Sequence, residues 1–241
     1  MDGASVPAHL LVLWDVDHTL IETGGVGSEI YAAAFGKVTG HPMTQMAHVH
    51  GRTEPVIFRD TLALNGLDDV PGLYESFAAE QADGYRRRRA DLRERGRALP
   101  GAAEALRALS GRPEVTQSVL TGNTRPAAEL KLAAFGLDGY VDFDAASYGT
   151  DSDLRACLVG IARDRAAARA GRQFTADTTV IIGDTPADVT AARDGGARII
   201  AVATGTYGTA ELTAAGAGTV LADLSDTTAF LAAVEASRPP R

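Results

Sequence analysis

Short apolar runs alternate with helical patterns along most of this chain. Runs that end in turn residues predict buried strands at 9–14, 115–121, 178–183 and 198–203, with a further strand near 140–144. Apolar positions with helical spacing predict helices between the strands, at 102–109, 125–135, 152–170, 186–194 and 226–236. Strands that alternate with helices are typical of a doubly wound parallel sheet, so the expected fold class is α/β.

The segment after the first strand has a different pattern. Three glycines interrupt the chain within 24–27, and the apolar positions of 28–95 then have helical spacing without a convincing strand. A Leu-Pro-Gly break at 99–101 precedes the alternating region. The pattern therefore predicts a small α-helical cap inserted after the first strand, on a glycine hinge. The expected division is a core of residues 1–23 and 97–241 and a cap of residues 24–96.

Composition and charge narrow the classes of function that this chain can have. With 45% hydrophobic residues, the 241-residue chain can bury a sizeable core, and its net charge of −8 argues against a nucleic-acid surface. The single cysteine, Cys157, excludes an internal disulfide and fits a reducing compartment. The N-terminus lacks the basic start of a signal peptide, and the run at 10–14 is too short to span a membrane. We expect a cytoplasmic protein, either monomer or homodimer.

Acidic residues follow two of the predicted strands. Asp15 and Asp17 come directly after the first strand, and Asp184 and Asp188 follow the strand at 178–183. Ligands of parallel sheets bind outside the carboxyl ends of the strands, so we expect these four carboxylates to lie together. They would repel one another unless a cation lay among them. Mg²⁺ is the simplest such cation, because it prefers oxygen ligands.

Three motifs together resemble those of the haloacid dehalogenase superfamily of aspartate-nucleophile phosphotransferases. They are Asp-X-Asp-X-Thr at 15–19, Thr-Gly-Asn at 121–123 and Gly-Asp-Thr-Pro-Ala-Asp at 183–188. The motif order and the helical insertion are similar to the phosphoglycolate-phosphatase-like branch, whose core is Rossmann-like. The resemblance covers about residues 9–235 and is weakest in the cap.

The resemblance implies a role for each residue of the first two motifs. Asp15 would be the nucleophile that forms an aspartyl-phosphate. Asp17 would act as general acid and base, with a pKa above that of a free aspartate. Thr121 would bind a phosphoryl oxygen, while Gly122 allows close approach of the backbone and Asn123 adds a donor. Taken alone, each motif is also a common turn or helix-cap sequence.

The third motif is expected to hold the metal. Asp184 resembles the direct Mg²⁺ ligand of the superfamily, alongside Asp15 and the main-chain carbonyl of Asp17. Asp188, four residues on, is placed to bind the metal through water or to orient Asp184. It also suits the N-terminus of a helix as a favourable negative charge, and the two roles are compatible.

The active-site cation has two candidates. Related proteins with a cap have Gly-Lys-Pro where this chain has Gly149-Thr150-Asp151. Arg155 is the favoured cation, and Lys131, one predicted helix earlier, is its rival. A solvated helix-face charge is the alternative for either residue.

The cap contributes one candidate loop. Gly51-Arg52-Thr53-Glu54 resembles the substrate-specificity loop of related phosphatases, so Arg52 and Thr53 are expected to bind substrate. Arg52 would pair with a carboxylate or a second phosphate, unless it is simply an exposed loop arginine.

The favoured function is therefore a Mg²⁺-dependent phosphatase that hydrolyses a small phosphorylated metabolite, with phosphoglycolate or a sugar phosphate as first candidates. A sugar phosphomutase would need the same motifs. A 2-haloacid dehalogenase is disfavoured by Asp17 and by the acidic pair at 184 and 188. A non-catalytic binding module would not need the intact acids.

Overall fold

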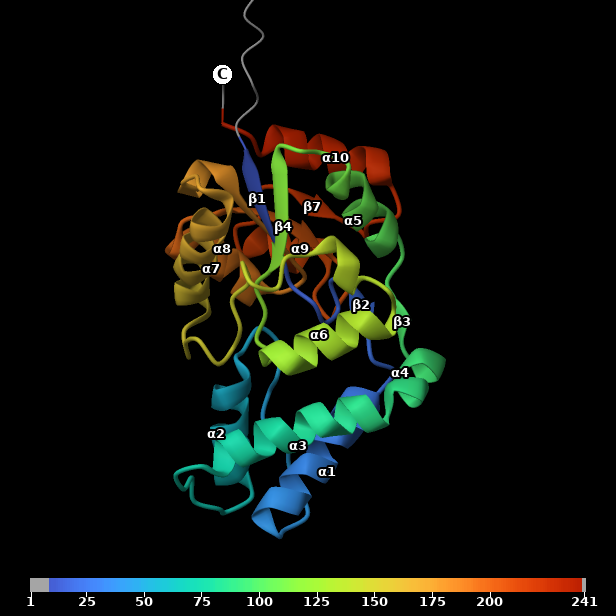
Figure 1. The fold of residues 1–241 in the computed structure, drawn as a ribbon, viewed down its shortest axis with the longest axis vertical. Helices are drawn as coiled ribbons and strands as arrows, with labels where there is room; N and C mark the ends of the chain where they lie inside the picture. The colour runs from blue at the N-terminus through green and yellow to red at the C-terminus, as the bar shows by residue number, and fades with distance from the viewer. Residues whose placement is uncertain (1–8, 240–241) are drawn as a thin grey trace, which may run out of the picture.

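The computed structural model describes residues 9–239, in which five parallel strands form a central sheet (Figure 1). In spatial order the strands are β4 (Val115–Val119), β1 (Leu10–Trp14), β5 (Thr179–Gly183), β6 (Arg198–Val202) and β7 (Val220–Leu221). Each neighbouring pair is parallel. The predicted α/β class with a doubly wound parallel sheet is confirmed.

Helices cover both faces of the sheet (Figure 1). Leu10, Val12 and Trp14 of β1 pack in one hydrophobic cluster with residues of α5 and α10, and Leu11 and Leu13 pack in a second cluster with residues of α7 and α8. A strand that is buried on both sides has no polar face, which explains the unbroken apolar run. The helices are α5 (Ala102–Ser110), α6 (Arg125–Ala134), α7 (Arg155–Ala170), α8 (Pro186–Gly195), α9 (Thr209–Ala214) and α10 (Thr227–Ala236), with short 3-10 turns at Asp138–Tyr140 and Ala176–Thr178.

The strand expected near 140–144 is wrong. After the 3-10 turn, the Asp142 side chain accepts a hydrogen bond from the backbone N–H of Asp144 at 3.0 Å, which favours a turn over a regular ladder. Asp142 contacts the edge strand β4 through hydrogen bonds with Gln117 and Ser118, and an isolated bridge between Leu120 and Ser147 follows beyond the segment. The short elements α9 and β7 were not predicted, because two to six residues are too few for a recognisable period.

Four helices lie between β1 and the rest of the sheet in sequence, and we keep the name cap for this group. They are α1 (Val26–Thr39), α2 (Glu54–Leu64), α3 (Leu73–Arg87) and α4 (Arg89–Arg95). They form a separate group beside the sheet (Figure 1), with an aromatic cluster in which the rings of Phe58 and Phe77 stack at 4.4 Å. A division of the chain into cap and core that move relative to one another stays a prediction.

The two links to the cap pair with each other. Strands β2 (Ile21–Glu22) and β3 (Arg97–Ala98) form an antiparallel pair, which the sequence pattern did not predict. Beside it, Gly24 has a φ of 58°, and a Cβ at this position would lie 2.1 Å from the carbonyl oxygen of Arg95. The glycine-rich entry is therefore required by backbone geometry and by close packing of the links. Across residues 9–239, no helix has the length and apolarity needed to cross a membrane.

Candidate active site

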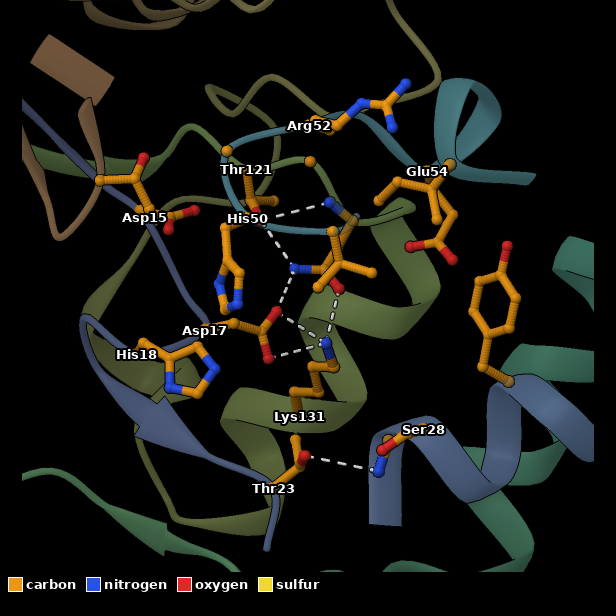
Figure 2. A pocket seen from close by; sticks show the side chains of 18 of the residues that line it. Asp15, Asp17, His18, Thr23, Ser28, His50, Arg52, Glu54, Thr121 and Lys131 are labelled. Atoms are coloured by element: carbon orange, nitrogen blue, oxygen red, sulfur yellow. Dashed lines mark hydrogen bonds and ion pairs between the residues drawn. The ribbon is translucent and has the colours of Figure 1, made fainter. Parts of the chain in front are cut away.

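The carboxyl ends of β1, β4 and β5 open into a cavity of about 320 Å³ between the sheet and the cap (Figure 2). Nine of the predicted site residues line it: Asp15, Asp17, Arg52, Thr121, Gly122, Asn123, Lys131, Arg155 and Asp184. Thr53 and Asp188 are buried next to lining residues and are not part of the wall. The fold thus brings together predicted residues that are spread between positions 15 and 188 of the chain.

Three buried carboxylates form a cluster at the base of this pocket, two of them in its lining and the third, Asp188, behind it. Asp15, Asp184 and Asp188 each offer an oxygen within 4.8 Å of the others. Burial, opposed by Arg155 and reinforced by the neighbouring acids, raises the pKa of Asp15 to about 7. Burial and repulsion by Asp15 and Asp188 raise the pKa of Asp184 to about 8.

The cluster fits a cation. Oδ1 of Asp184 accepts a hydrogen bond from the Thr19 hydroxyl at 3.2 Å, whereas Oδ2 is buried without a hydrogen-bond partner. A buried, unpartnered carboxylate oxygen is costly unless something positive or hydrogen-bonding meets it. Hard oxygen donors of this kind suit Mg²⁺.

Arg155, the first residue of α7, connects two of these acids. Its Nη2 lies 2.9 Å from Oδ1 of Asp15 and 2.6 Å from Oδ1 of Asp188, and its Nε donates to the same Asp188 oxygen at 2.9 Å. The other oxygen of Asp188 accepts from the backbone N–H and hydroxyl of Thr185, at 3.0 and 2.7 Å. Thr185 and Asp188 form a capping box at the start of α8. Asp188 is therefore occupied by protein donors and holds Arg155 against Asp15.

Lys131 of α6 contacts the other aspartate of the first motif. Its Nζ lies 2.9 and 2.7 Å from the two carboxylate oxygens of Asp17 and 2.6 Å from Oδ1 of Asn123. The ammonium also lies 5.3 Å from the ring centroid of Tyr85 in the cap, within cation–π range. Both candidate cations thus lie in the pocket, each on a different aspartate.

The expected pKa of Asp17 is wrong in direction. Burial alone would raise it, but the charge of Lys131 and the hydrogen bonds from Lys131 and Asn123 outweigh burial and hold the pKa of Asp17 below its ordinary value. Local sequence spacing does not encode this contact between the Lys131 ammonium and Asp17, because 114 residues separate the two in the chain.

The Thr-Gly-Asn turn joins these groups. Asn123 donates through Nδ2 to Asp17 at 2.8 Å and to the Thr121 hydroxyl at 2.7 Å, so its side chain is used within the protein. The carbonyl of Gly122 accepts a hydrogen bond from the Glu54 N–H at 2.8 Å. A Cβ on Gly122 would lie 2.0 Å from the Arg52 carbonyl oxygen. Glycine is needed here because the cap loop rests on this turn.

The cap loop packs Arg52 and Thr53 against other protein groups, and the substrate-binding role expected for the two residues stays a prediction. The Arg52 guanidinium donates to the His48 carbonyl at 3.1 Å, forms an ion pair with Asp60, and points away from Asp17 and Lys131 (Figure 2). Thr53 is buried at the start of α2, where its hydroxyl donates to the Asp153 carbonyl at 3.5 Å. Arg52 thus connects the loop to its own cap neighbours, and Thr53 connects it to the segment before α7.

A family model described as haloacid dehalogenase-like hydrolase matches residues 12–193, which includes all three motifs. The chain belongs to the haloacid dehalogenase-like hydrolases. No curated protein matches the chain.

Solved structures of low sequence identity share the fold of this haloacid dehalogenase-like hydrolase. A hydrolase from Pseudomonas syringae is 22% identical with a TM-score of 0.67, and 94% of this chain and 99% of that chain are covered. A predicted phosphoglycolate phosphatase from Haemophilus somnus 129pt is 15% identical with a TM-score of 0.64, covering 95% and 100%. A HAD family hydrolase from Deinococcus radiodurans R1, with bound phosphate and sodium, is 20% identical with a TM-score of 0.53, covering 98% and 99%.

Several residues that line the pocket of this haloacid dehalogenase-like hydrolase were not predicted, among them four with polar side chains on the cap helices. Tyr31 lies on α1, Glu54 begins α2, and Gln81 and Tyr85 lie on α3. Glu54 was within reach, because it ends the loop that was singled out for Arg52. A weak signal existed for Gln81 too, since it lies four residues after Phe77 and four before Tyr85, on the buried side of its helix.

Proposed function

We propose that this hydrolase is a Mg²⁺-dependent phosphatase that cleaves a small phosphate monoester through an aspartyl-phosphate on Asp15. The observation that carries the proposal is the setting of Asp15, whose carboxylate lies 2.9 Å from the Arg155 guanidinium and within 4.8 Å of Asp184. A carboxylate and a phosphate dianion repel each other, so the attack needs positively charged groups close to both of them.

In the first step, an oxygen of Asp15 attacks phosphorus and the bond from phosphorus to the ester oxygen breaks. Arg155 neutralises the nucleophile and the phosphoryl oxygens, and the buried Thr121 hydroxyl at the end of β4 binds one of these oxygens. Mg²⁺ held by Asp15 and Asp184, with the main-chain carbonyl of Asp17, would add charge neutralisation at the phosphoryl group.

Asp17 serves as the acid and base of the two steps. It carries a proton to the departing alkoxide and then takes one from the water that attacks phosphorus, which releases phosphate and restores Asp15. Because Lys131 holds Asp17 ionised, the ester must loosen this ion pair before Asp17 can take up its proton. The ester would loosen the pair by contacting Lys131 and replacing Asp17 as the partner of its ammonium.

The neighbours are consistent with this chemistry. The Deinococcus radiodurans R1 protein is described with bound phosphate and sodium, and the Haemophilus somnus 129pt protein is described as a predicted phosphoglycolate phosphatase. A small phosphorylated metabolite as substrate and a cytoplasmic setting complete the proposal.

The test is release of inorganic phosphate from a panel of small esters, with and without Mg²⁺. We expect release by the wild type that needs Mg²⁺ and is abolished in Asp15→Asn. Asp68→Asn, an exposed aspartate of the cap, is the matched control and should keep full activity. Transfer of phosphate within the substrate without release would show a mutase, and chloride release from a haloacid would show a dehalogenase. Either result would overturn the proposal.

A further inference from the structure

The cap wall of the pocket has a buried polar pair that the proposed reaction does not use. Glu54 at the start of α2 and Gln81 on α3 are 7% and 3% exposed, and both line the cavity that holds Asp15 and Asp17. In Figure 2 the Glu54 carboxylate faces into the pocket on the side opposite Asp15. If the phosphoryl group lies at Asp15, the leaving group of the ester extends toward this pair.

The pair offers hydrogen-bond acceptors. Nε2 of Gln81 donates to Oε1 of Glu54 at 2.7 Å, and Oε1 of Gln81 is buried without a partner. Within residues 9–239, no side chain or backbone group donates a hydrogen bond to Oε2 of Glu54. The buried, unpartnered oxygen of Gln81 calls for a donor, because an unmet buried acceptor costs free energy.

The same wall has no cation that is free to meet an anionic leaving group. Lys131 is shared between Asp17 and Asn123, and Arg52 is paired with Asp60 and turned outward. A carboxylate at this end would lie beside Glu54, and the cation whose charge acts on Glu54, Lys131, is already paired with Asp17. Apolar side chains from Met46, Val49 and Ile57 complete the cap wall and suit a carbon chain.

We propose that Glu54 and Gln81 form the leaving-group site, and that it selects an uncharged leaving group with hydroxyl groups over one that ends in a carboxylate. This inference rests on the proposed phosphatase reaction. It disfavours phosphoglycolate, one of the first substrate candidates, and favours polyol or sugar phosphates. A specificity pocket built of buried polar groups rejects a partner that leaves them unmet far more strongly than an apolar pocket does.

The test uses pairs of esters that differ by one group. Glycerol 3-phosphate and 3-phosphoglycerate form one pair, and sorbitol 6-phosphate and 6-phosphogluconate form the other; in each, a terminal CH₂OH replaces a carboxylate. We expect kcat/KM to favour the hydroxyl member at least about tenfold. Equal values, or preference for the acid, would overturn the proposal, the latter showing that Glu54 donates a proton to the carboxylate. Preference for the analogue of glycerol 3-phosphate in which an amino group replaces the C1 hydroxyl would also overturn it, by showing an ammonium site.

Variants assign the preference to the pair. Glu54→Gln keeps shape and removes the charge, and Gln81→Met removes the free amide oxygen, so each should reduce the hydroxyl-to-acid ratio about five- to tenfold. Glu75→Gln, an exposed glutamate of α3, should leave the ratio unchanged. The ratio cancels a general loss of active protein, and unfolding curves show whether each variant is folded. An unchanged ratio in folded Glu54→Gln and Gln81→Met would contradict the assignment.

Failure of the reaction and failure of this inference are distinguishable. If no ester is hydrolysed, the same pairs are titrated into Asp15→Asn with Mg²⁺ and binding is followed by calorimetry. Tighter binding of the hydroxyl esters than of the acid esters would support the leaving-group site even if no ester is hydrolysed. This preference should be lost in the double variant Asp15→Asn/Glu54→Gln. Equal binding of both members would overturn it.

Discussion

The ammonium of Lys131 lies 2.7 Å from one carboxylate oxygen of Asp17 and 2.9 Å from the other. Asn123 bonds to both members of this pair, through its Nδ2 to Asp17 and its Oδ1 to Lys131. The first motif is thereby connected to the second motif and to α6, and the proposed acid–base group is held ionised. A charge-assisted network of this kind positions its members as well as setting their protonation.

Removing the ammonium should move the pH dependence. In Lys131→Met the main group that lowers the pKa of Asp17 is gone, so burial dominates and the pKa rises. We expect the limb of the kcat–pH profile that reports Asp17 to move to higher pH by about one unit or more, with a lower maximal rate. The measurement is kcat from pH 4 to 9. Lys37→Met, an exposed lysine paired with Glu80, is the control, and an unmoved limb in Lys131→Met would refute the link.

Arg155 should be required for both activity and stability. Arg155→Met leaves Asp15 and Asp188 buried without their cation, and loss of one partner of a buried pair costs about 3–5 kcal/mol. We expect kcat/KM to fall about a thousandfold or more, with a lower unfolding temperature, and Arg155→Lys to recover only part. Steady-state kinetics and thermal unfolding measure both effects. Arg193→Met, an exposed arginine of α8, should match the wild type, whereas an active Arg155→Met would exclude the role.

The acidic cluster predicts how stability depends on pH and metal. The pKa values of Asp15 and Asp184 in the folded protein, about 7 and about 8, lie above the ordinary value of 3.8. Between pH 3.8 and pH 8 the folded state therefore binds more protons than the unfolded state. Unfolding free energy of the metal-free protein should therefore fall as the pH rises from about 4 to about 8. Saturating Mg²⁺ should raise the unfolding temperature by about 5–10 °C at pH 8 and much less at pH 5.5.

Asp184→Asn separates this effect from general charge effects. It removes one acid, so the metal-free protein should lose less stability with rising pH, and the shift caused by Mg²⁺ should largely disappear. Asp68→Asn, exposed in the cap, should behave as the wild type. Thermal unfolding at several pH values with EDTA or Mg²⁺ gives the comparison. A full Mg²⁺ shift in Asp184→Asn would show that the metal binds elsewhere.

Contact between the turn after β4 and the cap loop should be sensitive to one methyl group. In Gly122→Ala the new Cβ would lie 2.0 Å from the Arg52 carbonyl oxygen, so the loop that carries Glu54 must move. We expect kcat/KM to fall at least about tenfold, because small displacements of positioned groups are costly. Gly160→Ala, which places its Cβ in open space on α7, is the matched control. Wild-type kinetics in Gly122→Ala would show that the contact is unimportant.

Sequence patterns predicted the parts of this molecule that depend on local rules. Four of the five sheet strands and most helices followed from apolar periodicity, and the three motifs placed Asp15, Thr121 and Asp184 correctly at strand ends. What the patterns missed depends on contacts between distant segments. The ion pair of Lys131 with Asp17 and the pairing of Glu54 with Gln81 join residues 114 and 27 positions apart, and no local spacing encodes such a meeting. The outward turn of Arg52 likewise depends on Asp60, a neighbour that its loop motif does not contain.

The central claim is that Asp15 carries the phosphoryl group during the reaction. The most direct measurement is rapid acid quenching of the enzyme with Mg²⁺ and a ³²P-labelled ester, followed by isolation of the labelled peptide. We expect protein-bound label, released by hydroxylamine as an acyl phosphate, that forms in milliseconds to seconds and maps to Asp15. No label should form in Asp15→Asn. Label on another residue, or phosphate release by Asp15→Asn at the wild-type rate, would contradict the proposal.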